Sequence, residues 1–381
     1  MTGGNDRLMN PPPAMTEHFS NYTHKGPVEI SIKMKEAAPA AEDVVIIPRR
    51  YGIKPILSEG NRKISFSVDQ PRYLIVIVNN DWCRPLFLFG NPPEKSVPDP
   101  SDPAVLTISP NEDYRKAANR SRLKDYRVIR FAPGYHDIGF YFPIYSNQTI
   151  YLAGGSYVAG TISSMTEKWE KISNFGVKRG FFNKKIYDSH GFQAYNNPED
   201  FILFKDSDEM KENIGASSNI TIRGRGILSA EQMDWFKYCE SIKIIKISKE
   251  SNNGILEGLV LMGRHHHGPK MLSSNTTAAC ENIKIIHGFH GNTDACGWGY
   301  KRRNIFTTQA DDGTYFQTGL DVDGWLAWQQ NNANLFCIQR KAVPNGGTLG
   351  HVVIRNVTAI DGRYGGGQVK NLREAHYSPA G

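Results

Sequence analysis

Two short stretches of this sequence carry three carboxylates that could act together, Asn292-Thr293-Asp294 and Asp311-Asp312. Asp294 precedes Asp312 by about one turn of a coil built from short repeats. If successive turns of such a coil stack on one another, these acids become neighbours in space. Carboxyl groups clustered in a groove can supply a proton at one point and activate water at another, which is what hydrolysis of a glycosidic bond requires.

Repeats that could stack the acids are visible in the second half of the chain. Short strands are expected to begin at Ile227, Leu259, Ile283, Ile305, Trp325 and Val357, and many of them follow Asn or Gly. The segments between them lack the amphipathic helices that an α/β sheet would need. The pattern therefore predicts a coil of parallel strands, in which each turn buries its inward face against its neighbours.

Aligning the repeats by these strand starts places the residues at offsets of six and seven in one stripe. The stripe contains His265, His266, Phe289, His290, Asp311, Asp312, Asn331 and Asn332. Parallel neighbours lie about 4.8 Å apart, so Asp294, just beyond the stripe, should approach the Asp311-Asp312 pair. Because adjacent strand residues face opposite sides, both aspartates can face a groove only at a bulge or bend, which Gly313 could permit.

Structural interpretations of the same residues remain open. Asp-Asp-Gly is a common turn sequence, and either aspartate could cap a turn or pair with Arg302 or Arg303. His265, His266 and His267 favour a polar groove wall over a metal site, because three consecutive residues do not converge on one ion without unusual backbone geometry. The residues Trp298, Trp325 and Trp328 are interpreted mainly as core, although Trp298 could stack on a sugar ring.

A different pattern precedes the repeats. After a polar segment over residues 1–24, four short strands separated by Pro, Gly, Asn and Asp predict a small β-sandwich over residues 25–104. Its end, residues 91–104, is a stiff Pro-rich linker. The coil then occupies residues 105–381. A mixed basic and aromatic stretch at 165–212 interrupts it and is predicted to leave the coil as a long loop.

Composition limits the possible functions. The chain has 381 residues, 39% of them apolar, and a net charge of +7 that is spread along the sequence. This charge pattern, without a recognised binding motif, argues against a nucleic-acid partner, and no apolar run approaches the ~20 residues of a membrane span. The five cysteines show no metal-binding spacing and are expected to be buried free thiols. We expect a monomer without a cofactor or metal.

The two acidic stretches resemble the Asn-Thr-Asp and Asp-Asp motifs of polygalacturonases and of the dextranase and isopullulanase family. Three further segments are closer to the dextranase branch, which also carries an N-terminal β-sandwich: Leu86-Phe-Leu-Phe-Gly-Asn-Pro-Pro-Glu, Tyr151-Leu-Ala-Gly-Gly-Ser-Tyr-Val and Ile222-Arg-Gly-Arg-Gly-Ile-Leu. The resemblance covers roughly residues 25 to 165 and 213 to 365. It implies an all-β protein with a right-handed parallel β-helix of the pectin-lyase-like superfamily after the sandwich.

The resemblance also implies an activity. It predicts an inverting glycoside hydrolase acting on a polysaccharide, with Asp311 as general acid and with Asp294 and Asp312 activating water. His265, His266, His290, Asn331, Asn332 and Trp298 are the expected substrate-binding residues. An extracellular or periplasmic protein is implied, although Met1 to Asn21 lacks the basic and apolar regions of a secretion signal.

The chain also departs from the family pattern. The connection between Asp294 and Asp311 is shorter than usual, so one strand of that turn is expected to be reduced or missing. Gly-His-Gly and Arg-x-Lys elements that hold a uronic acid have no clear counterpart, and the helix is expected to be truncated at its C-terminus. These departures keep two alternatives open: a polysaccharide lyase on the same fold, and a catalytically inactive carbohydrate-binding relative.

Overall fold

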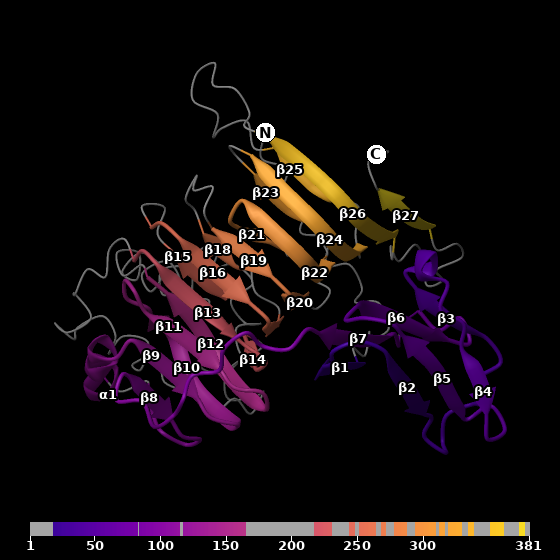
Figure 1. Ribbon diagram of the computed structural model, residues 1–381, viewed down its shortest axis with the longest axis horizontal. Helices are drawn as coiled ribbons and strands as arrows, with labels where there is room; N and C mark the ends of the chain where they lie inside the picture. The colour runs from indigo at the N-terminus through magenta and orange to yellow at the C-terminus, as the bar shows by residue number, and fades with distance from the viewer. Residues whose placement is uncertain are drawn as a thin grey trace, which may run out of the picture.

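The structure is a computed structural model that describes residues 18–82, 84–114, 117–164, 217–230, 244–247, 251–263, 268–271, 278–287, 294–309, 312–316, 319–329, 334–338, 351–361 and 373–377. Within these ranges the regular elements are nearly all strands, and the helical segments are α1 (Ala117–Ser121), η1 (Arg49–Tyr51) and η2 (Arg122–Asp125). None of these helices is long and apolar enough to cross a bilayer. The predicted all-β class is confirmed (Figure 1).

Two small sheets make up the N-terminal sandwich. One has the strand order β1-β7-β6-β3 and the other β2-β5-β4. The strands are β1 (His18–Thr23), β2 (Val28–Lys33), β3 (Val44–Ile47), β4 (Ile56–Ser58), β5 (Lys63–Val68), β6 (Tyr73–Val78) and β7 (Leu86–Asn91). Alternating apolar residues such as Ile64, Phe66, Leu74 and Val76 fill the space between the two sheets, as expected for a sandwich.

The rest of the described chain winds into a coil whose first two faces are ladders of parallel strands. The first face contains β8 (Val105–Ile108), β9 (Val128–Phe131), β11 (Thr149–Leu152), β13 (Ile220–Gly224), β16 (Gly254–Glu257), β19 (Ala279–Glu281) and the first halves of β22 (Lys301–Gln309), β24 (Leu320–Gln329) and β26 (Val352–Asp361). The second face contains β10 (Gly134–Pro143), β12 (Ser156–Ser163), β14 (Ile227–Ser229), β17 (Val260–Met262), β20 (Lys284–Ile286) and the second halves of β22, β24 and β26.

A third face closes the coil. It runs from the end of β12 through β15 (Ile245–Ile247), β18 (Lys270–Met271) and β21 (Gly297–Trp298), and a further parallel pair follows, β23 (Thr314–Phe316) with β25 (Phe336–Ile338). The strand β27 (Arg373–Tyr377) pairs antiparallel with β26. This is the parallel β-helix that the sequence predicts. The strand of the turn that was expected to be shortened, β21, has two residues, as does β18 on the same face.

The Asn and Gly residues before the strands form the corner between the first and second faces. Asn282, Asn304 and Asn356 have φ values of 53°, 48° and 53°, and Gly258 and Gly324 have 84° and 80°. This left-handed conformation is strained for most residues but accessible to Gly and Asn. In addition, the Asn304 amide donates a hydrogen bond to Asn282 Oδ1 at 2.8 Å. The sequence pattern thus marks a repeated corner of the coil.

This corner also tests the alignment by strand starts. Val260 pairs with Lys284 and Lys284 with Phe306, so Leu259, Ile283 and Ile305 share one ladder position, which continues through Trp325 and Val357. Ile227 was aligned wrongly, because it pairs with Val260. The corner after β13 is one residue longer than the corner after β16.

Replacing Asn304 by alanine is expected to lower the free energy of unfolding by about 2 kcal/mol, because alanine strains the left-handed corner and loses the amide hydrogen bond. Asn304→Gly should cost less, since glycine adopts the same φ freely. Urea unfolding of the two variants measures the difference. Equal losses of unfolding free energy in the two variants would show that the left-handed backbone at this corner does not favour glycine over alanine.

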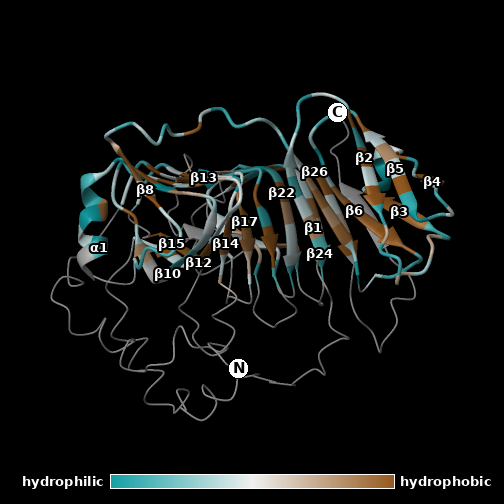
Figure 2. Ribbon diagram, turned by 90° about the horizontal axis from the view of Figure 1, so that it is seen from below, coloured by the Kyte–Doolittle hydropathy of each residue, from teal (hydrophilic) through white to brown (hydrophobic). Residues whose placement is uncertain are grey.

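One outward face of the β-helix is covered by the four-stranded sheet of the sandwich. Phe87 and Phe89 of β7 pack on Phe306, with ring centroids 4.8 and 4.9 Å apart. Trp328 contacts both Phe87 and Trp82. The hydrophobic contact continues along the second face of the coil, where the buried residues are Val260, Ile286, Phe306, Leu326, Trp328 and Ile360. Figure 2 shows hydrophobic strands in both parts of the molecule and a hydrophilic α1.

A buried polar cluster lies within this contact between the sandwich and the β-helix, which we call the seam. Lys284 Nζ donates hydrogen bonds to Asn91 Oδ1 at 2.7 Å, to Gly258 O at 2.7 Å and to Asn282 O at 3.0 Å. Burial lowers the pKa of Lys284 well below its usual value, and the nearby Arg225 lowers it further. The Asn91 side chain also bonds with Tyr73 Oη, Asn21 Oδ1, Tyr22 O and Phe89 O.

Candidate active site

Asp294 and Asp312 lie on successive turns of the coil, where the chain enters the third face. The backbone N–H of Ala295 donates to Asp312 O at 2.9 Å, and that of Cys296 donates to Gly313 O at 2.9 Å. The ladder continues to the preceding turn, because Gly268 N–H donates to Asp294 O at 2.6 Å. Stacking therefore brings together two acids that are 18 residues apart.

Several predicted site residues lie outside the described residues. These are Asp311, His265, His266, His290, Asn331 and Asn332, and the loop predicted at 165–212 is outside them as well. Asp311 directly precedes Asp312 in the chain, and His267 directly precedes Gly268. The roles expected for these residues stay predictions.

The predicted stripe, which placed residues at a fixed offset from the strand starts side by side, is wrong beyond the end of the second face. The residue that follows Asp312 in the ladder is Asn334, whose carbonyl accepts the Gly313 N–H at 2.8 Å. The prediction placed Asn331 and Asn332 there. Asp294, Asp312 and Asn334 lie eleven, seven and nine residues after Ile283, Ile305 and Trp325. The corner leading to the third face thus varies in length, so a fixed offset cannot be carried across it.

The side chains of Asp294 and Asp312 differ in exposure. Asp294 is 7% exposed, whereas Asp312 is half-buried and accepts a hydrogen bond from Asn334 N–H at 3.0 Å. Asp312 therefore caps the next turn, as the structural interpretation expected. Since β22 ends at Gln309 and β23 begins at Thr314, Asp312 lies in a bend where strand alternation does not apply.

Gly313 lies in this bend, as the sequence predicts, but without a left-handed conformation. It is absent from the residues with positive φ, and a Cβ at this position would lie 2.6 Å from Leu335 O. Its lack of a side chain therefore lets two turns approach closely, and no left-handed bulge is present.

Trp298 does not contact solvent. Its exposed fraction is 0%, and its Nε1–H donates to Gly254 O at 3.3 Å inside the coil. A sugar cannot stack on this ring, so the expected substrate-binding role was wrong. Burial confirms the core interpretation for Trp298, Trp325 and Trp328 alike.

Arg302 joins the two turns that carry the aspartates. This side chain is only 2% exposed and points into the coil. It donates to Trp298 O at 3.1 Å, to Gly299 O at 3.2 Å and to Thr314 Oγ1. Thr314 in turn donates to Cys296 O at 2.7 Å. Arg302 thus links the turn after Asp294 to the turn after Asp312, and none of these bonds goes to a carboxylate.

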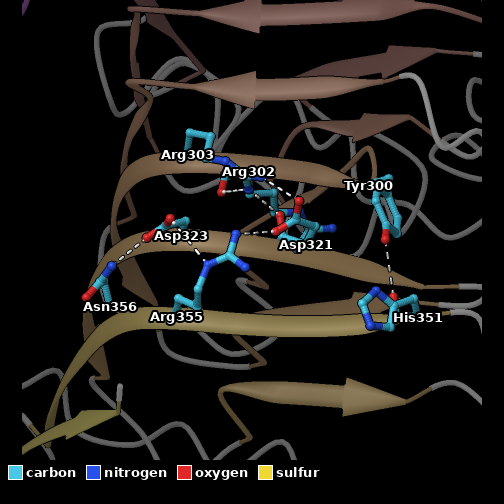
Figure 3. A network of polar contacts seen from close by, with 8 residues as sticks. All are labelled: Tyr300, Arg302, Arg303, Asp321, Asp323, His351, Arg355 and Asn356. Carbon is cyan, nitrogen blue, oxygen red and sulfur yellow. Dashed lines mark hydrogen bonds and ion pairs between the residues drawn. The ribbon is translucent and has the colours of Figure 1, made fainter. Parts of the chain in front are cut away.

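Arg303 points outward and belongs to a separate network (Figure 3). It forms an ion pair with Asp321 on β24, which also binds Arg355 on β26 at 3.2 Å. Arg355 reaches Asp323 as well, at 3.4 Å. The predicted alternative, in which Arg302 or Arg303 pairs with the candidate acids, is not found among these contacts. The network instead connects three turns on the first face.

The two free thiols that the structure describes, Cys280 and Cys296, are both buried, as predicted. Cys280 shares a ladder position with Arg302. A hydrogen bond from the Cys280 thiol, helped by the Arg302 guanidinium, lowers the pKa of Cys296 to about 6 despite burial. The same hydrogen bond, together with burial, raises the pKa of Cys280. A thiolate at Cys296 would balance the buried charge of Arg302.

This arrangement predicts a pH dependence of stability. Because the pKa of Cys296 falls from 9.0 to about 6 on folding, its contribution is fully present above pH 9 and is lost as the pH falls towards 6. Cys296→Ala should therefore lower the free energy of unfolding more at pH 8.5 than at pH 5.5. Urea unfolding at both values measures this. An equal loss at the two values would exclude a thiolate.

Sequence reasoning missed the polar residues that end the second face just before the aspartates. Gln309 pairs with Gln329 on the next strand, and its amide donates to Gln329 Oε1 at 2.8 Å. His287 directly follows the preceding strand, β20, and is fully buried. A polar residue at or just after the end of β20, β22 and β24 is the signal that could have identified them. Among the described residues, no group of three or more His, Cys, Asp or Glu is placed to hold a metal ion.

Comparisons with known proteins concern the fold alone. No model of a known protein family matches the sequence, and no curated protein matches it significantly. Dex49A from Penicillium minioluteum matches in structure with a TM-score of 0.49 and 12% identity, over 91% of this chain and 67% of the other. The Family 28 exopolygalacturonase of Yersinia enterocolitica matches with a TM-score of 0.38 and 10% identity, over 92% and 73%.

Proposed function

We propose that this protein is a glycoside hydrolase that cleaves O-glycosidic bonds of a polysaccharide with inversion, using Asp294, Asp311 and Asp312. The observation that supports this most is the ladder contact between Ala295 and Asp312, 2.9 Å from N to O. It puts two of the three acids on neighbouring turns at the same corner of the coil, with the third directly before Asp312 in the chain.

In the proposed mechanism the protonated carboxyl of Asp311 gives its proton to the leaving glycosidic oxygen. Asp294 and Asp312 accept hydrogen bonds from a water molecule and take its proton as the water attacks the anomeric carbon from the opposite side. Inversion requires about 6.5–9.5 Å between acid and base, which leaves room for the water. The hydrogen bonds of Arg302 and Thr314 would hold the two turns at a fixed separation during this step.

One observation favours a second candidate function. Asp294 is only 7% exposed, and such limited access to solvent suits a structural carboxylate better than one that must hydrogen-bond to an attacking water molecule. A carbohydrate-binding relative without turnover would bind the polysaccharide and release no product.

A polysaccharide panel separates these functions. Dextran, pullulan and polygalacturonan are incubated with the protein, and new reducing ends are counted. Release from one substrate, with inverted anomeric configuration of the product by NMR, is the expected result. Binding without new ends would establish the second function instead. Ends that appear together with the absorbance of an unsaturated uronide would identify a lyase.

A further inference from the structure

A cavity of about 480 Å³ opens on the three-stranded sheet of the sandwich. Its lining comes from β2, β4, β5 and the segments after η1 and β5, and includes Glu29, Tyr51, Lys54, Ile56, Asp69 and Arg72. Its volume lies within the range of small-ligand sites. The cavity is remote from the aspartates, because the four-stranded sheet lies between this sheet and the β-helix (Figure 1).

The polar wall of the cavity is held in place before any ligand arrives. Arg72 donates two hydrogen bonds to Asp69, from Nε to Oδ1 at 3.0 Å and from a terminal nitrogen to Oδ2 at 3.1 Å. The Arg72 guanidinium also stacks on the Tyr51 ring, 4.1 Å from its centroid. Tyr51 packs against the sandwich core. A fixed donor and acceptor pair loses little conformational entropy when it binds a ligand.

The charges of the lining point to an uncharged ligand. Glu29 and Asp69 supply two carboxylates, and Lys54 and Arg72 supply two cations, so the lining has no formal net charge. An anion or a cation would meet as much repulsion as attraction here. Asp69 is 69% exposed on its side chain, so it keeps acceptor capacity for hydroxyl groups besides its bonds to Arg72.

An apolar surface lies beside this polar wall. Ile56 is 67% exposed, the highest fraction among the large hydrophobic residues that the structure describes. Pro27 and Ile53 line the same cavity. Across the sheet, Ile56 is paired with Ser65, and Ser67 with Glu29, so two hydroxyls and a carboxylate lie on the strands beside this apolar surface. A pyranose ring has the matching character, with an apolar C–H face and a polar hydroxyl edge.

We propose that this cavity is a second, non-catalytic binding site for a neutral glycan, in which Asp69 and Arg72 bind ring hydroxyls and Ile56 contacts the C–H face of a sugar. The choice of a glycan rests in part on the proposed function. With one chain bound at both sites, the sandwich would raise the local concentration of polysaccharide near the coil.

Affinity electrophoresis of the full chain in gels containing dextran tests this. The double variant Asp69→Ala, Arg72→Ala should bind dextran about tenfold or more weakly than the wild type. Ile56→Ser removes the apolar contact at an exposed position and should also weaken binding. The matched control is Asp81→Ala, Arg84→Ala, an ion pair with the same spacing outside the cavity, at 2.6 Å; its mobility should equal that of the wild type.

Each other outcome overturns the proposal. These are unchanged binding by both cavity variants, absence of any retardation by dextran, and retardation by polygalacturonate that the cavity variants lose. The outcome is independent of catalysis, because Asp312→Asn should bind at the cavity as the wild type does. Loss of binding in the cavity variants without reducing-end release by the wild type would uphold this site and reject the hydrolase.

Discussion

Replacement of Asp311 by asparagine is expected to lower kcat by about 10³-fold, because the amide cannot give a proton to the leaving oxygen. The free energy of unfolding should stay within about 0.5 kcal/mol of the wild-type value. Reducing-end release from the best substrate of the panel measures the first quantity, and urea unfolding measures the second. Asp312→Asn should lose turnover as well, since it removes one of the two carboxylates that we propose activate water.

The control for this experiment is Asp323→Asn. Asp323 is an aspartate on the first face of the coil, bound to Arg355 and Asn356, and an amide there keeps the bond from Asn356 through its oxygen. Its kcat should match the wild type. Turnover retained in Asp311→Asn would remove this residue from the role of general acid, whatever the effect of Asp312→Asn.

Asn91→Ala is expected to lower the free energy of unfolding by about 3–5 kcal/mol. The change deprives Lys284 Nζ of one of its three buried acceptors and leaves other polar groups of the seam without their partner. Each buried group left unsatisfied costs about 1–3 kcal/mol, and more when it is charged. Urea or thermal unfolding of the full chain measures the loss.

A double-mutant cycle with Lys284→Met supplies the control. When the lysine is replaced by an apolar side chain of similar length, Asn91→Ala no longer leaves a buried amine without one of its hydrogen-bond acceptors. Its cost should therefore fall by at least about 1 kcal/mol in the Lys284→Met background. If the losses of unfolding free energy in the two single variants simply add in the double variant, the Asn91 amide stabilises only the sandwich. The hydrogen bond from Lys284 Nζ to Asn91 would then contribute nothing.

The sequence was sufficient to predict the repeat and much of its register. Asn282, Asn304 and Asn356 stand at a corner that only a few residue types can form, so their positions fix the strands that follow. The neighbourhood of Asp294 and Asp312 followed from the same periodicity. Where the corner varies in length, as before Asn334, no local signal fixed the register, and the residue next to Asp312 in the ladder is Asn334 instead of the expected Asn332.

Contacts made by long-range packing were beyond the reach of the sequence. Lys284 and Asn91 are 193 positions apart, and neither belongs to a motif. Arg302 looked like a partner for a carboxylate, but its acceptors are backbone carbonyls and Thr314, which no sequence pattern identifies. Trp298 failed as a sugar platform for a related reason, because an aromatic residue in a strand has the same pattern whether it faces the core or the solvent.

The interface between the sandwich and the coil also implies an order of folding, in which the sandwich forms before the turns that it covers. Phe306, Leu326 and Trp328 project from the outside of successive turns and become buried only against the sandwich. Since synthesis proceeds from the N-terminus and domains tend to fold as they emerge, the sandwich precedes every turn it covers. The sandwich can act as a template on which each newly made turn docks. A coil made without the sandwich would expose a row of hydrophobic side chains to other molecules.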